Sequence, residues 1–251
     1  MEKVKQLDRS FQLPYYACDM KGCWTPAFIL AWMQEISGAH SELLGCGRKD
    51  LIKENIVWIL SRIEVEMNRY PLAEEEITVT TFPKENRRWF FPRYYVFQSS
   101  KGEVLGKASA LWALLDINER KMVSPEKILP MMPDNRDIQA PMGFPSPSKT
   151  IGGKEKTWQY KPMYEDIDVN EHVNNTRYMT WLLNALEKEV VEEHVLESFC
   201  INYDAEILPD ANLTLTLRQE GMECSLTGVQ DGKNHFEISG VLRKRIEGEH
   251  Y

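Results

Sequence analysis

A short run of polar residues near position 170 is the strongest candidate for chemistry in the sequence. Asp168, Asn170 and His172 alternate with Val169 and Glu171. In an extended backbone, successive side chains point to opposite sides, so a carboxylate, a carboxamide and an imidazole would share one face. Spacing alone fits a turn-and-capping network about as well as it fits a site for acid–base chemistry.

The residues that follow indicate where this polar run lies. Asn174 and Asn175 are good helix N-caps, and apolar residues at helical spacing predict a helix over Asn175–His194. The triplet therefore precedes a helix N-terminus, where free N–H groups and the helix dipole favour negative charge.

Composition narrows the class of protein. The chain has 251 residues, 43% hydrophobic and 27% charged, which suits one large or two small soluble domains. Its net charge of −8 argues against general nucleic-acid binding. We find no phosphate-binding glycine loop and no dinucleotide fingerprint, and we expect no cofactor.

The cellular location is predicted from apolar run length, the N-terminal sequence and the cysteines. No apolar run approaches the roughly 20 residues that span a bilayer, and the N-terminus lacks the apolar segment of a signal peptide. The cysteines are odd in number and never spaced as Cys-x-x-Cys, which argues against disulfides and a zinc ribbon. We expect a cytoplasmic protein with no metal. The five cysteines are Cys18, Cys23, Cys46, Cys200 and Cys224.

The elements that must position the polar run occur twice. In the first half, an extended stretch at residues 11–18 precedes a helix from Thr25-Pro26 to about Leu44. Four segments rich in β-branched and aromatic residues then predict strands at Ile56–Met67, Glu76–Phe82, Trp89–Ser99 and Val104–Ile117.

A proline-rich stretch separates this half from a second with the same order. Residues 118–157 contain six prolines and predict a linker, with one short helix near Pro125–Leu129. After it come an extended stretch (Trp158–Tyr164), the Asn175–His194 helix, and strands at Glu197–Glu206, Leu213–Gln219, Cys224–Gln230 and His235–Lys244. We predict an N-terminal domain over residues 1–120, a linker over 121–157 and a C-terminal domain over 158–251.

Matching residues support a repeat. Sliding the sequence so that Asp19 falls on Asp168 also places Cys23 on His172 and Trp32 on Trp181. A slightly smaller displacement then pairs Ile63 with Ile201, Pro71 with Pro209, and Ile77 with Leu215.

The two copies differ at the polar run. The first copy has Asp19, Lys21 and Cys23 at the positions of the triplet, so we predict one active site per chain, in the second half. A long helix wrapped by an antiparallel sheet, repeated in tandem, predicts an α+β double hotdog. The two sheets can join edge to edge, which would hide an aggregation-prone edge strand.

The string Asp-Val-Asn-Glu-His-Val-Asn-Asn-x-x-Tyr-x-x-Trp, Asp168 to Trp181, closely resembles the signature of acyl-acyl carrier protein (ACP) thioesterases. Supporting similarities are Trp58-Ile-Leu-Ser-Arg-Ile-Glu-Val, Asn68-Arg-Tyr-Pro and the Arg87-Arg-Trp run. The resemblance covers residues 11 to 244. It implies a tandem hotdog that hydrolyses the thioester of a fatty acyl chain on ACP.

The resemblance also implies catalytic residues, namely Asp168, Asn170, His172 and, in the following strand, Glu206. The family has a Cys next to that Glu, but here the residue is Ile207. A cysteine nucleophile is then missing, and we favour direct attack by water. Either Glu206 or His172 can be the general base, and the sequence does not decide between them. Asn170 would hold the water or the substrate carbonyl, with Asp168 orienting a partner.

Substrate contacts are predicted in three places. Backbone N–H groups of Val173, Asn174 and Asn175 would form an oxyanion hole. The acyl chain would run through the first half, past some of the apolar residues of its helix and strands, although most of those on the helix are expected to be ordinary core. Those residues are Phe28, Ile29, Leu30, Trp32, Met33, Ile36, Trp58, Ile59, Trp89, Phe90, Phe91 and Trp112. The acidic carrier protein would dock on local basic groups, which are Arg48, Lys49, Lys84, Arg87, Arg88 and Arg93.

Two other functions compete with this prediction. The same fold and chemistry could act on acyl-coenzyme A, or the chain could be a silent acyl-binding protein. Four retained polar residues argue against a silent binder. Acyl chain length and the choice between a monomer and a homodimer are not set by the sequence.

Overall fold

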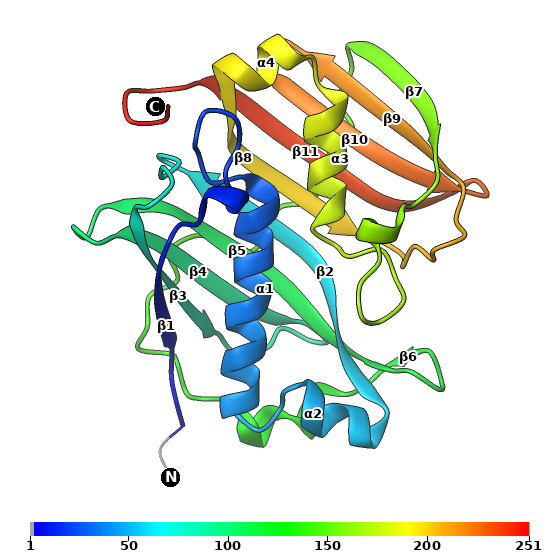
Figure 1. Ribbon diagram of the computed structural model, residues 1–251. Coiled ribbons are helices and arrows are strands. Elements are labelled where there is room, and N and C mark those ends of the chain that lie inside the picture. The colour runs from blue at the N-terminus through cyan, green and yellow to red at the C-terminus, as the bar shows by residue number, and fades with distance from the viewer. Residues whose placement is uncertain (1–2, 251) are drawn as a thin grey trace.

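Each half of the chain forms a helix lying across one face of an antiparallel sheet (Figure 1). The structure is a computed structural model that describes residues 3–250. The first half comprises β1 (Leu7–Gln12), α1 (Pro26–Leu43), α2 (Arg48–Leu51), β2 (Ile56–Met67), β3 (Glu76–Pro83), β4 (Phe91–Ser99), β5 (Val104–Asp116) and β6 (Lys121–Met122). The second comprises β7 (Lys154–Tyr160), α3 (Arg177–Ala185), α4 (Lys188–Glu193), β8 (His194–Tyr203), β9 (Leu213–Glu220), β10 (Glu223–Gln230) and β11 (Lys233–Lys244).

The boundaries of α1 follow from its end residues. The Thr25 hydroxyl accepts a hydrogen bond from the Phe28 N–H, and Pro26 occupies the first turn. The helix stops before Gly45, whose φ of 77° suits glycine. Both ends confirm the sequence prediction. The first extended stretch was placed too late, because β1 ends at Gln12 and residues 15–17 form a 3-10 turn.

The second helix was predicted as one continuous element, which is wrong. The structure has α3 and then α4, because the backbone of Leu186 and Glu187 is extended, with ψ near 150°. The break buries Leu186 in the core and leads α4 directly into β8 (Figure 1). Strand β8 accordingly starts at His194, earlier than predicted, and ends at Tyr203 rather than Glu206.

The two sheets join at their centre into one sheet. Among the described residues it has eleven strands, of which ten follow the order β1-β3-β4-β5-β2-β8-β11-β10-β9-β7. The order of the second five mirrors that of the first five. The junction between β2 and β8 confirms that the halves meet edge to edge, and it covers two edges that would otherwise be open.

An approximate two-fold axis passes through the centre of this junction. Ile63 of β2 lies directly opposite Ile201 of β8, and these are the residues that the predicted repeat equates. Exchanging the two copies therefore maps this pair onto itself. The flanking pairs are consistent with the same exchange: Arg62 with Asn202, and Glu64 with Cys200.

The proline-rich segment crosses this junction as a strap. Its backbone N–H groups donate to side chains on successive strands, from Ser146 to Glu64 of β2 at 2.7 Å and from Ser148 to Asn202 of β8 at 3.2 Å. Further along, Lys149 donates to Ser239 of β11 at 3.3 Å. Glu64 alternates with the buried Ile63 and Val65, so the strap covers the face opposite the helices. The predicted short helix is present as two 3-10 turns, Pro125–Lys127 and Leu129–Met131.

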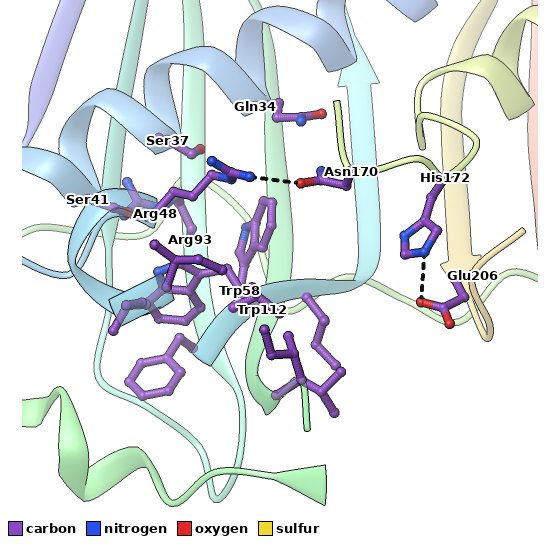
Figure 2. Close-up of a pocket in the computed structure, with 18 of the residues that line it drawn as sticks. Gln34, Ser37, Ser41, Arg48, Trp58, Arg93, Trp112, Asn170, His172 and Glu206 are labelled. Atoms are coloured by element: carbon purple, nitrogen blue, oxygen red, sulfur yellow. Dashed lines mark hydrogen bonds and ion pairs between the residues drawn. The ribbon is translucent and has the colours of Figure 1, made fainter. Parts of the chain in front are cut away.

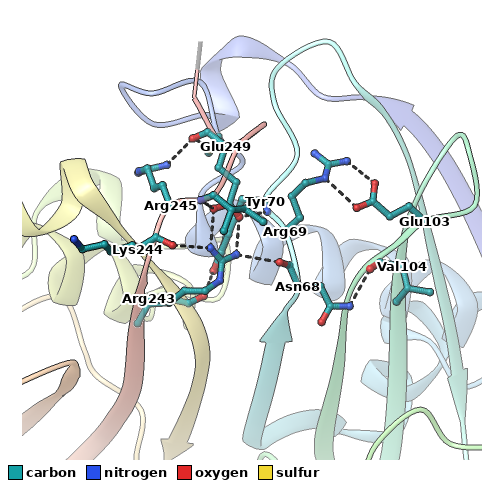
Figure 3. A network of polar contacts seen from close by, with 12 residues as sticks. Asn68, Arg69, Tyr70, Glu103, Val104, Arg243, Lys244, Arg245 and Glu249 are labelled. Atoms are coloured by element: carbon teal, nitrogen blue, oxygen red, sulfur yellow. Dashed lines mark hydrogen bonds and ion pairs between the residues drawn. The ribbon is translucent and has the colours of Figure 1, made fainter.

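A buried ion-pair network holds the end of the chain between the two halves (Figure 3). The fully buried Glu249 receives hydrogen bonds from Arg243 of β11 at 2.6 and 2.7 Å, and from the Tyr70 N–H at 2.8 Å. Burial alone would raise the pKa of Glu249. The hydrogen bonds from Arg243, Ile246 and Tyr70 outweigh that effect, so its pKa is lowered. Among the helices of the described residues, none has the length and apolar character to cross a membrane.

Candidate active site

The polar run is a tight turn rather than an extended strand. The Asp168 N–H donates to the His172 carbonyl at 2.8 Å, and Ile167 and Val173 form an antiparallel bridge on either side. The Asp168 carboxylate accepts from the Asn170 N–H at 2.8 Å. The predicted alternation is therefore wrong. Asn170 and His172 line a cavity from the turn, whereas Asp168 braces the turn from within.

The same turn is present in the first half, which confirms the repeat at this site. The Asp19 N–H donates to the Cys23 carbonyl at 2.8 Å, and the Asp19 carboxylate accepts from the Lys21 N–H at 2.9 Å. Each copy has one residue with positive φ at the same place: Gly22 at 84° and Glu171 at 61°. Outside glycine, this conformation has a cost that the surrounding turn must offset.

The side chains of the two turns make different contacts. In the first copy, the Asp19 carboxylate binds Arg245 at 2.6 Å, and the Cys23 thiol donates to the Glu249 carbonyl at 2.9 Å. That turn is engaged in holding the chain end. The second copy instead directs Asn170 and His172 into a cavity.

An imidazole–carboxylate pair lies at one side of this cavity (Figure 2). His172 Nε2 is 3.5 Å from Glu206 Oε2, although Glu206 follows β8 far along the chain. The other carboxylate oxygen of Glu206 accepts from Arg120, which reaches across from the turn between β5 and β6. The two side chains of the pair are about one third exposed, so solvent reaches them. The structure thus brings Glu206 to His172.

Asn170 has a partner in the first half of the chain. Arg48 Nη2 of α2 lies 3.5 Å from Asn170 Oδ1 (Figure 2). A guanidinium only donates hydrogen bonds, so it fixes the amide oxygen on its own side. The Asn170 NH₂ group is then left to donate elsewhere.

The cavity has a volume of about 590 Å³ and extends from the turn with Asn170 and His172 to the first half of the chain. Its strand walls carry Trp58, Phe91 and Trp112, three of the residues predicted to line the path of the acyl chain. From α1, however, the lining residues are small or polar, at helical spacing i, i+3, i+4 and i+7. They are Gln34, Ser37, Gly38 and Ser41.

Several predicted lining residues lie elsewhere. Ile29, Met33 and Ile36 of α1 are fully buried in the core beneath the sheet. Trp32 stacks on Phe11 with ring centroids 3.8 Å apart, and Trp89 is exposed at the turn before β4. The apolar stripe of α1 is ordinary core, because the helix turns its polar face toward the cavity.

Two of the three backbone N–H groups predicted to form the oxyanion hole already donate to carbonyls of the protein. The Val173 N–H donates to the Ile207 carbonyl at 2.9 Å, and the Asn174 N–H donates to the Asp166 carbonyl at 2.8 Å. Neither can turn toward a substrate without breaking the turn, so the prediction is wrong for these two. The Asn174 side chain accepts from the Thr176 N–H at 3.0 Å and closes a turn just before α3. The N-cap of α3 is Thr176 rather than Asn174 or Asn175, so the predicted caps are wrong. Asn175 lies outside the cavity lining.

No cysteine occupies the cavity. Ile207, at the position where the family has a Cys, is completely buried in the core. Burial raises the pKa of all five thiols, to about 11 for Cys18 and Cys46 and to about 12 for the other three. A thiolate nucleophile therefore has no place in this site.

The predicted docking cations divide into two groups. Lys84 donates to the Asn135 and Ile138 carbonyls, and Arg93 is only 6% exposed, so neither can form an outer surface. Arg48, Lys49, Arg87 and Arg88 are exposed. The Arg87 guanidinium lies 4.4 Å from the centre of the Phe144 ring. Sequence reasoning missed Arg120 and the cavity-facing roles of Arg48 and Arg93; the spacing of the polar residues on α1 was the one local signal.

Two helix-on-sheet units joined at a shared central junction define a tandem hotdog protein. The chain matches the acyl-ACP thioesterase N-terminal domain over residues 4–129 and the C-terminal domain over residues 151–244. It belongs to the acyl-ACP thioesterase family.

Curated relatives are plant enzymes. The chain is 25% identical over 241 residues to oleoyl-acyl carrier protein thioesterase 1 of Arabidopsis thaliana, covering 86% of this chain and 66% of the relative. It is 26% identical to an acyl-[acyl-carrier-protein] hydrolase of Cuphea viscosissima, covering 82% of this chain and 53% of the relative. The chain thus spans between half and two thirds of the length of these relatives.

Solved structures share the fold. An acyl-ACP thioesterase from Bacteroides thetaiotaomicron superposes with a TM-score of 0.84 at 24% identity, covering 95% of this chain and 98% of the other. The 12:0-ACP thioesterase from Umbellularia californica gives 0.80 at 20% identity, covering 96% and 98%. These similarities confirm the predicted double hotdog.

Proposed function

We propose that this protein hydrolyses the thioester of a fatty acyl chain carried on ACP, releasing the free acid and the carrier thiol. The observation that carries the proposal is the His172–Glu206 pair beside Asn170, at the side of a 590 Å³ cavity. Family membership supports it, since the plant relatives are named for this hydrolysis. A cavity of this size suits an extended acyl chain.

Water is the proposed nucleophile, because the cavity lining contains no cysteine. We assign the general base to His172. Both oxygens of Glu206 already face partners, the guanidinium of Arg120 and the imidazole of His172. Glu206 is therefore arranged to orient His172 and to stabilise the imidazolium that forms when water loses its proton. The imidazolium can then return that proton to the departing thiolate.

Asn170 is the proposed donor to the thioester carbonyl. Arg48 occupies the amide oxygen, which leaves the NH₂ group to stabilise the developing oxyanion in place of the engaged backbone N–H groups. Asp168 is a positioning residue, because its carboxylate holds the turn on which Asn170 and His172 stand.

The test is hydrolysis of acyl-ACP by the wild type and by His172→Gln, Glu206→Gln and Asn170→Ala proteins. Each variant should lose activity while keeping the melting temperature of the wild type. A matched control is Glu189→Gln, an exposed carboxylate on α4. Near-normal turnover in all three folded variants would overturn the assignment.

The carrier is tested separately. For the same acyl chain, kcat/KM should be higher with acyl-ACP than with acyl-coenzyme A. Exposed Arg48, Lys49, Arg87 and Arg88 are the proposed docking cations, so reversing Arg87 and Arg88 to Glu should raise KM for acyl-ACP and leave acyl-pantetheine unchanged. Equal rates on both carriers would favour the coenzyme A reading, and acyl binding without release would favour the silent binder.

Localisation and assembly are proposals as well. The free state of all five cysteines supports a reducing, cytoplasmic setting. The domain division at residues 120 and 158 stays a prediction, which limited proteolysis tests directly. Sedimentation decides between a monomer and a homodimer, a choice that the sequence leaves open.

A further inference from the structure

The cavity contains a buried cation that hydrolysis does not use. Arg93 of β4 is 6% exposed and lines the cavity. Its recorded partners are all neutral: His40 Nδ1 at 3.1 Å, Thr81 Oγ1 at 3.4 Å and Ser41 Oγ at 3.5 Å. Within residues 3–250, no carboxylate forms an ion pair with it.

His40 cannot supply the missing charge. Arg93 only donates, so His40 Nδ1 accepts, and the proton of the ring lies on Nε2, which faces the Val4 carbonyl at 2.9 Å. Burial and the nearby Arg93 charge lower the pKa of His40 to about 4. The imidazole is therefore neutral at pH 7, and the guanidinium is a buried charge without a counter-ion.

Burying such a charge is costly unless an anion joins it. A guanidinium has five N–H donors, and the three recorded hydrogen bonds leave two without a protein acceptor in the described part of the chain. A pair of guanidinium N–H groups matches the two oxygens of a carboxylate. The uncompensated charge and the open donors thus point to the same kind of ligand.

Position decides which part of a ligand would meet Arg93. Figure 2 shows Arg93 and Ser41 on the side of the cavity away from His172 and Glu206. An acyl chain with its thioester at His172 would direct its far end toward them. The wall there is mixed. Helix α1 contributes the Ser37 and Ser41 hydroxyls and open space at Gly38, where an added Cβ would meet no atom within 4 Å, and the strands contribute Trp58 and Trp112.

We propose that the cavity accepts acyl groups bearing a carboxylate at the end distal to the thioester, with Arg93 and Ser41 as its binding site. This rests on the proposed function for the placement of the thioester. It makes Arg93 a specificity-determining residue that separates ω-carboxyl from methyl-ended chains. An uncharged ω-hydroxyl would engage the same donors more weakly, since it has no charge to compensate.

Binding tests the proposal without turnover. The probes are acyl-pantetheine amides, in which an amide replaces the thioester, ending in a carboxylate, a hydroxyl or a methyl group over a series of chain lengths. Trp58 and Trp112 line the cavity, so quenching of tryptophan fluorescence reports occupancy. At the best-fitting length, the ω-carboxyl amide should bind the wild type about tenfold more tightly than its methyl-ended counterpart.

Two substitutions place the effect on Arg93. Arg93→Met should abolish the preference while keeping affinity for methyl-ended amides, and Arg93→Lys should retain part of it. Ser41→Ala is a milder change and should reduce the preference for the ω-carboxyl amide. It keeps the proposal testable if Arg93→Met fails to fold. Equal affinity of all three end groups for the wild type, or an unchanged preference in a folded Arg93→Met protein, would overturn the proposal and make Arg93 a structural link between α1 and β4.

The His172→Gln protein separates this proposal from the hydrolase assignment. It should bind ω-carboxyl amides like the wild type while losing hydrolysis. If hydrolysis fails in the wild type and the end-group preference persists, the thioesterase proposal falls and the Arg93 site stands. If the wild type hydrolyses acyl-ACP but shows no end-group preference, the Arg93 proposal falls and the thioesterase proposal stands.

Discussion

His172 Nε2 lies 3.5 Å from Glu206 Oε2, although His172 precedes α3 in the sequence and Glu206 follows β8. The carbonyl of Ile207, next to Glu206, accepts the Val173 N–H, next to His172, at 2.9 Å. The backbone thus ties the two side chains together. Their alignment is a property of the fold rather than of one loop.

This alignment predicts separable roles within the pair. Glu206→Gln keeps the shape of the side chain but removes the charge that would stabilise a histidine cation. Hydrolysis should fall about 100-fold in kcat with KM nearly unchanged, and His172→Gln should cost more, because general-base catalysis is typically worth 10²–10⁴-fold. Steady-state kinetics on acyl-ACP measures both. A larger loss from Glu206→Gln than from His172→Gln would reassign the base to Glu206.

Arg120 should act through Glu206 alone. Arg120→Met removes a contact that crosses from the first half to the Glu206 carboxylate. We expect kcat to fall by about tenfold and the double variant with Glu206→Gln to be no worse than Glu206→Gln by itself. Additive losses in this double-mutant cycle would show that Arg120 has an independent contact with the substrate.

Gly38 offers a direct test of the acyl cavity. A Cβ at this position would enter open space, so Gly38→Leu should fill part of the cavity without a clash. Long methyl-ended amides should then bind more weakly while short ones are unaffected. The free energy of unfolding should rise by about 1 kcal/mol, because glycine is a poor residue for a helix interior. Gly38→Ala is the matched control, which gains helix stability and fills little space; unchanged binding of the longest amide to Gly38→Leu would contradict this placement of the acyl chain.

Much of this site could be predicted from sequence, but for different reasons at different residues. Asp168, Asn170, His172 and Glu206 were named by the family string, and the repeat correctly equated Asp19 with Asp168. The alternation argument nevertheless failed, because the Asp168 carboxylate and the His172 carbonyl close a turn that periodicity does not reveal.

Contacts between distant segments lay beyond sequence reasoning. Arg48 and Arg93 were predicted only as docking cations, and Arg120 was not singled out. Only packing shows that α2, β4 and the β5–β6 turn bring them to one cavity. The single second helix was wrong because apolar spacing continued through Leu186, although the backbone turns there. The joining of the two sheets edge to edge was predictable, because the repeat and the need to cover sheet edges both favoured a central junction.

Glu249 should govern stability in acid. Its pKa is lowered in the folded state, so its contribution is present above the ordinary value of 4.5 and is lost as the pH falls through the lower folded value. Glu249→Gln should cost about 3 kcal/mol at pH 7, because it removes the fully buried carboxylate that pairs with the partly buried Arg243. Its stability should then depend less on pH below 4.5 than that of the wild type. Urea unfolding at several pH values measures both, and a parallel acid limb in the two proteins would contradict the assignment.

Ile207→Cys tests whether a cysteine nucleophile could operate at this position. Ile207 is completely buried in the core, and burial raises the pKa of every natural thiol in the chain. The new thiol should resist iodoacetamide in the native protein, form no acyl-enzyme with substrate and give no gain in kcat. Gly38→Cys is the positive control, because its thiol would face the open cavity and should be alkylated at the rate of an accessible cysteine. Thiol mass spectrometry after brief treatment distinguishes the two. An acylated Ile207→Cys protein would show that the core around residue 207 opens during turnover, and water would then have to share the role of nucleophile with a side chain.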